Sequence, residues 1–85
     1  MNISKHEQRV LHELALGGSI HYERRDNGKI RDITCFTRQG HILTDCTYEV
    51  FRRLRKGRFV HSSKGQPYRL SRLGGSVVRA QLNQR

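Results

Sequence analysis

The side chains best suited to chemistry lie between residues 47 and 71, where arginine and lysine are concentrated. This segment holds seven basic residues and one acidic residue, Glu49, for a net charge of +6 out of the chain's +10. The basic residues are Arg52, Arg53, Arg55, Lys56, Arg58, Lys64 and Arg69. Arginine predominates, and its planar guanidinium donates forked hydrogen bonds to phosphate or carboxylate groups. We expect this basic group to bind an anionic partner, either a nucleic acid or an acidic protein surface.

The same residues could instead form a solvated helix face, on which Glu49 pairs with Arg53 one turn away. Such a pair stabilises a helix by only about 0.2–0.5 kcal/mol. Because one carboxylate is available for seven cations, the binding interpretation is favoured.

Catalytic groups are scattered along the chain and form no motif. A small ribonuclease would need an acid and a base, for which the candidates are His12 with Glu13, or His61 with Tyr68. We expect these histidines to be ordinary surface residues. No glycine-rich phosphate loop and no metal-ligand spacing is found in the sequence. The prediction is a protein without enzymatic activity, metal or cofactor.

The first half of the chain predicts a helix followed by a β-hairpin. Ser4 and Glu7 have the spacing of a capping box at the start of a helix over residues 5–16. An Asp-Asn-Gly turn, typical of tight hairpins, joins predicted strands at residues 19–25 and 29–36. Apolar residues alternate with polar ones in both strands, so one face is expected to be buried. The residues expected on that face are Ile20, Tyr22, Ile33 and Cys35.

A second helix is expected to carry most of the basic group. Asp45 or Thr47 can serve as its N-cap, and it is expected to run to about Lys56, with Gly57 at the C′ position. Its apolar side is formed by Val50, Phe51 and Leu54. Arg52 and Lys56 lie on the opposite side.

The remainder predicts a second hairpin and a last helix. Strands at residues 59–61 and 68–70 flank a polar loop at 63–66. The last helix is amphipathic and is weakened near its start by the Gly-Gly pair at 74–75. Its apolar residues are Leu73, Val77, Val78, Ala80 and Leu82. The expected fold is a single α+β domain over residues 1–85, in the order helix, hairpin, helix, hairpin, helix. The basic helix followed by a hairpin is winged-helix-like, although a hairpin replaces the usual supporting helix.

Length and composition agree with a small intracellular domain. A chain of 85 residues has room for about one domain with a thin core. No apolar run exceeds three residues and no apolar segment follows the N-terminus, so we expect a cytoplasmic protein with no membrane contact. Cys35 and Cys46 are expected to be reduced, half-buried side chains.

Five short blocks of sequence are similar to those of one family. They are Glu7-Gln8-Arg9 with Leu11-His12 and Gly17-Gly18, Asp45-Cys46-Thr47, Val50-Phe51 with Leu54, Gly65-Gln66-Pro67-Tyr68-Arg69, and Val78-Arg79-Ala80-Gln81-Leu82. In this order they resemble the YjhX family of bacterial toxins over essentially the whole chain.

The resemblance implies the toxin of a toxin–antitoxin pair that inhibits DNA topoisomerase I. It also implies a cognate antitoxin similar to an acetyltransferase. Our first hypothesis is a toxin that binds topoisomerase I, or its complex with DNA, through the basic helix and the wing. The alternatives are a winged-helix DNA-binding transcriptional regulator and, less favoured, a small ribonuclease toxin.

Overall fold

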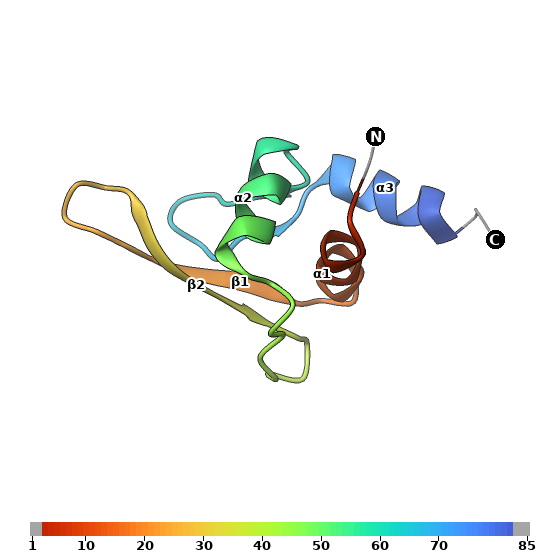
Figure 1. Ribbon diagram of the computed structural model, residues 1–85, viewed down its shortest axis with the longest axis horizontal. Helices are drawn as coiled ribbons and strands as arrows, with labels where there is room; N and C mark the ends of the chain where they lie inside the picture. The colour runs from red at the N-terminus through yellow and green to blue at the C-terminus, as the bar shows by residue number, and fades with distance from the viewer. Residues whose placement is uncertain (1–2, 83–85) are drawn as a thin grey trace.

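The computed structural model describes residues 3–82, and the side chains of residues 3–80. These residues form a mixed α+β domain with three helices and two small antiparallel sheets (Figure 1). In chain order the elements are α1 (Lys5–Ala15), β1 (Ser19–Arg24), β2 (Ile30–Phe36), α2 (Tyr48–Lys56), β3 (Val60–His61), β4 (Arg69–Leu70) and α3 (Arg72–Leu82). The predicted α+β class and order of elements are therefore confirmed. Within the described part, every helix is too short or too polar to cross a membrane.

Helix α1 begins at the predicted N-cap, although only the Ser4 half of the predicted capping box forms. The Oγ of Ser4 accepts a hydrogen bond from the backbone N–H of Glu7 at 3.2 Å and donates one to the Glu7 carboxylate at 3.1 Å. Glu7 is only 6% exposed. The helix ends at Ala15, just before the predicted boundary, and Gly17 then adopts a φ of +112°. This left-handed conformation favours glycine and turns the chain towards β1.

The first hairpin buries the face that its alternation predicts. Ile20 lies opposite Cys35 and Tyr22 lies opposite Ile33 in the antiparallel register. Ile20 and Cys35 are buried, while Tyr22 and Ile33 are half-buried and pack against the core. The predicted tight Asn-Gly turn is not formed, because Gly28 has a φ of +84° but Asn27 does not share this left-handed conformation, and a longer loop joins Arg24 to Ile30. Figure 1 shows this loop projecting away from the helices, which lie over the other end of the hairpin.

The hydrophobic core lies between this hairpin face and the helices. Helix α1 contacts both α2 and α3, and α2 also contacts β2 and β3. The largest fully buried side chains are Phe51, Leu11, Ile20, Leu54, Val10 and Cys35. Residues from α1, the first hairpin and α2 therefore share one core.

Of the two N-caps considered for α2, the structure selects Thr47. Its Oγ1 accepts a hydrogen bond from the backbone N–H three residues later, at 3.3 Å. The Asp45 carboxylate instead lies 3.4 Å from Arg9 and 3.7 Å from His6, both on α1. Asp45 therefore links the segment before α2 to α1.

The prediction that Gly57 is the left-handed C′ residue of α2 is wrong. Gly57 has a φ of −77°, and the left-handed residue is Arg58, with a φ of +61°. Glycine is needed at 57 for space, because a Cβ there would lie 2.6 Å from the ring of Phe59. The sequence pattern identified the helix end correctly and the reason for the glycine incorrectly.

The second hairpin is shorter than predicted and is joined to the first. Strands β3 and β4 pair Val60 with Leu70 and His61 with Arg69. The backbone of Tyr68, just before β4, exchanges two hydrogen bonds of 2.8 and 2.9 Å with Ile20 of β1. This bridge places the second hairpin against the end of the first.

The last helix buries a different side from the one expected. Leu73 is 47% exposed, whereas Val78 is buried and Val77 is half-buried. Ala80 is exposed, and the side chain of Leu82 lies outside the described residues. The inward side of α3 is thus formed partly by glycine, which a pattern of large apolar residues does not reveal.

Gly74 and Gly75 provide a matched pair of substitutions. A Cβ at Gly74 would lie 2.2 Å from the carbonyl oxygen of Phe59, whereas a Cβ at Gly75 would meet only ordinary contacts at 3.8 Å. We expect Gly74→Ala to lower the free energy of unfolding by about 2 kcal/mol through steric overlap. Gly75→Ala is expected to raise it by up to about 1 kcal/mol through helix propensity. Urea denaturation of both variants checks this, and equal effects at the two positions would contradict it.

Candidate anion-binding surface

Helix α2 separates its buried and its charged residues by helical periodicity. Val50, Phe51 and Leu54 are buried, while Arg52 and Lys56 are exposed on the other side of the helix. The predicted division of this helix into two sides is confirmed. The exposed side chains cannot contribute to the core, so they are free to contact a partner.

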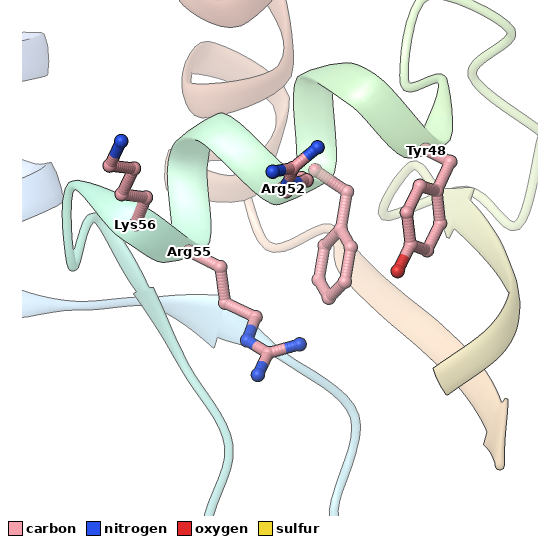
Figure 2. A pocket seen from close by; sticks show the side chains of 5 residues that line it. Tyr48, Arg52, Arg55 and Lys56 are labelled. Atoms are coloured by element: carbon pink, nitrogen blue, oxygen red, sulfur yellow. The ribbon is translucent and has the colours of Figure 1, made fainter. Parts of the chain in front are cut away.

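Three of the predicted basic residues line one hollow of about 420 Å³ beside α2. Its lining residues are Tyr48, Phe51, Arg52, Arg55 and Lys56. Figure 2 shows Tyr48 and Arg55 on the same side of the helix, with Arg52 between them and Lys56 near its C-terminal end.

Two aromatic residues line this hollow, the exposed Tyr48 and the buried Phe51. The Arg55 guanidinium lies 6.0 Å from the centre of the Phe51 ring, within reach of a cation–π attraction. The Tyr48 ring lies 6.3 Å from that of Phe51. The hollow therefore combines three cations with one exposed aromatic ring, that of Tyr48.

Arg53 differs from its neighbours because two carboxylates lie beside it. It is 3.6 Å from the buried Glu7 of α1 and 3.8 Å from Glu49. The Glu49 pair was predicted from the sequence, whereas the Glu7 pair joins two helices far apart in the chain. Since Glu7 is almost fully buried, Arg53 offsets the cost of that buried carboxylate. Arg53 thus has a structural partner.

The other three predicted residues come from the second hairpin and the turn before it. Arg58 is held in its left-handed conformation, and its carbonyl accepts a hydrogen bond from Ser71 at 2.7 Å. Lys64 lies in the hairpin loop with a φ of +53°, and Arg69 is exposed in β4. None of the three lines the hollow beside α2. Of the seven predicted residues, three therefore line the hollow beside α2, three lie in or just before the second hairpin, and Arg53 pairs with carboxylates instead.

The sequence did not identify a second hollow, of about 390 Å³, that shares Tyr48 with the first. Its other lining residues are Arg25, Lys29, Ile30 and Arg31, at the turn of the first hairpin. Tyr48 is 47% exposed, which is high for so large an aromatic side chain. Its position one helical turn before Arg52 was the available signal that it lies on the charged part of α2.

The two acid–base pairs considered for catalysis lie on different elements, and the first of them, His12 with Glu13, lies on α1. His12 is exposed on α1. His61 is exposed in β3, whereas the Tyr68 ring is buried and lies 5.1 Å from the Phe51 ring. Because Tyr68 faces the core, it does not share a surface with His61. The residues described include no group of three His, Cys, Asp or Glu side chains that could hold a metal ion.

Cys35 and Cys46 are both free thiols, buried more deeply than the sequence predicted. A hydrogen bond between their side chains, together with burial, raises the pKa of Cys46. Cys46 is thereby held as a neutral thiol in the core.

Comparison with known proteins identifies a family but no structural relative. No solved structure matches the chain. Curated relatives include UPF0386 proteins of Parvibaculum lavamentivorans and of Beijerinckia indica, 58% and 56% identical over 85 residues and covering 100% of both chains. A UPF0386 protein of Aliivibrio fischeri is 49% identical over the same length. The family model that matches residues 1–85 is described as "Putative toxin of bacterial toxin-antitoxin pair". The chain therefore belongs to the YjhX toxin family, as its sequence blocks indicated.

Proposed function

We propose that this protein is the toxin of a toxin–antitoxin pair and that it binds and inhibits DNA topoisomerase I without catalysing a reaction. Family membership supports the toxin role. The topoisomerase is proposed from the resemblance described above. The observation that supports this mode of action is the α2 surface, where Arg52, Arg55 and Lys56 line one hollow. None of these three forms a salt bridge with another residue in the described part of the chain.

Such a surface is suited to an anionic partner held outside the protein. The planar guanidinium of arginine donates forked hydrogen bonds to phosphate or carboxylate that a lysine cannot reproduce. We propose that α2, with Arg58, Lys64 and Arg69 of the second hairpin, competes for or clamps the DNA path of the topoisomerase. The protein would then act in the cytoplasm, where its cognate acetyltransferase-like antitoxin would bind and neutralise it.

A second candidate is a winged-helix regulator that binds duplex DNA. It is favoured by the isolated bridge between Ile20 and Tyr68, which places β1 against the β3–β4 hairpin that follows the basic helix α2. A strand pairing with a hairpin that follows a basic helix is typical of winged-helix domains. One feature argues against a winged-helix regulator. A helix-turn-helix has a supporting helix just before its recognition helix, whereas here β1 and β2 precede α2.

Relaxation of supercoiled plasmid by topoisomerase I distinguishes the two. We expect the purified protein to inhibit relaxation at concentrations too low to shift the same DNA in a gel without enzyme. The topoisomerase should also be retained by the immobilised protein after nuclease treatment. Inhibition only where the DNA is already coated, or none, would replace the toxin proposal with the regulator.

A further inference from the structure

We infer that the two hollows on either side of Tyr48 form one binding site for single-stranded nucleic acid. The site runs from the turn of the first hairpin, across the Tyr48 ring, to the basic side of α2. It includes Arg25 and Lys29, which lie outside the basic group found in the sequence. Because it shares α2 with the proposed inhibitory surface, this inference rests on the proposed function.

The first argument is that the two hollows share a residue, Tyr48. Tyr48 lines the hollow of about 420 Å³ with Arg52, Arg55 and Lys56, and also the hollow of about 390 Å³ with Arg25 and Lys29. Helix α2 contacts β2, so the helix and the hairpin are held together by packing. One ring therefore stands between two groups of cations that come from segments more than twenty residues apart in the sequence.

The second argument is that, among the described residues, most basic side chains around the two hollows form no salt bridge that would compete with a bound phosphate. In the described part of the chain, Arg25 and Lys29 form no salt bridge, and the same holds for the three cations of α2. Arg31 is different, because its guanidinium lies 2.6 Å from Glu23 and 3.0 Å from Asp32. The remaining nearby carboxylates are Asp26, in the hairpin turn, and Glu49, which pairs with Arg53. Cations exceed unpaired carboxylates on both sides of Tyr48.

The third argument is the exposed aromatic ring, which favours a single strand over a duplex. In a duplex the faces of the bases are covered by their neighbours, so a protein that binds only phosphates gains little from an aromatic side chain. In a single strand a base can stack on such a ring while basic residues follow the backbone. Tyr48 is 47% exposed and Arg52 lies one helical turn away, so a base on the ring would have cations on both sides.

Fluorescence anisotropy with a labelled oligothymidine of about 12 nucleotides tests this inference. We expect the protein to bind this probe about tenfold more tightly than a duplex of the same length. Tyr48→Ala should weaken single-strand binding by about tenfold, the usual effect of losing one stacked base. Tyr48→Phe should retain it, because the ring is kept. A half-exposed residue is not needed for the core, and circular dichroism of each variant verifies folding.

Two double variants with the same change in net charge locate the phosphate contacts. Arg25→Gln with Lys29→Gln should reduce the salt dependence of single-strand binding, lowering the log–log slope by about 1.4 for two contacts. Lys5→Gln with Arg38→Gln removes two charges from α1 and from the loop at the other end of the first hairpin. That control should leave the slope within error of the unsubstituted protein. An oligouridine probe of equal length shows whether RNA or DNA is preferred.

The outcomes separate this inference from the proposed function. Equal affinity for single strand and duplex, or unchanged single-strand binding by Tyr48→Ala, would overturn the inference. A protein that inhibits topoisomerase I but binds no single strand would also overturn it, while the proposed function would stand. A protein that binds the single strand through Tyr48 but does not inhibit would support the inference and remove the proposed function.

Discussion

Charge reversal at Arg52 and Lys56 is expected to abolish inhibition of topoisomerase I while the fold remains intact. Both side chains are exposed on α2 and both line the hollow beside it. Replacing two cations with glutamates puts like charges against an anionic partner, which costs several kcal/mol. At about 1.4 kcal/mol per tenfold change, binding should weaken by about 100-fold or more. Titration of the double variant in the plasmid relaxation assay measures this.

A control with the same change in net charge excludes a general electrostatic effect. Lys5→Glu with Arg38→Glu alters the charge as much, on exposed residues that line neither hollow beside Tyr48. We expect this control to inhibit within about threefold of the unsubstituted protein, because distant exposed charges are screened by salt. If the Arg52 and Lys56 variant folds and inhibits normally, the basic side of α2 is only a solvated surface and the proposed site is wrong.

The sequence predicted the elements well because local rules determine most of their boundaries. Ser4 and Thr47 cap their helices by hydrogen bonds within three residues, and such contacts depend on neighbouring sequence alone. The alternation of the first hairpin is equally local. Strand alternation then predicted the buried face, on which Ile20 lies opposite Cys35.

What the sequence did not predict depends on contacts between distant segments. Gly57 was interpreted as a C′ residue and Gly74 as a residue that weakens its helix, yet both make room for Phe59, through its ring and its carbonyl oxygen. Likewise, the pairing of Arg53 with Glu7 became visible only once α1 and α2 were placed together. No periodicity along the chain encodes either of these contacts.

The candidate site was likewise predicted where local spacing determines it and missed where it depends on contacts between distant segments. Helical spacing predicted that Arg52 and Lys56 face away from the core, and the structure agrees. It could not show that the turn of the first hairpin adds Arg25 and Lys29 to the same region, because that depends on how α2 packs on β2. Net charge by segment therefore located the basic helix but underestimated the extent of the basic surface.

Truncation of Phe51 to alanine is expected to lower the free energy of unfolding by about 3–5 kcal/mol. Phe51 is 1% exposed, and its ring packs edge-on against Tyr68 at 5.1 Å. In so small a domain that loss is a large part of a total stability of about 5 kcal/mol. Urea denaturation measures it, with Leu16→Ala as the control, because Leu16 is 53% exposed and should change stability by less than about 0.5 kcal/mol. A Phe51→Ala protein as stable as that control would show that the core is not built around this ring.

The Phe51 substitution also decides how other variants on α2 are to be interpreted. Phe51 lines the hollow beside α2 and contacts Arg55, so its loss would remove inhibition whether or not the hollow binds a partner. Loss of function at Phe51 therefore does not identify a binding residue. Tyr48 and Arg52 are exposed on the same helix, so their variants should keep the stability of the parent protein. A loss of binding at those two positions, with unfolding unchanged, would place the partner on the exposed side of α2.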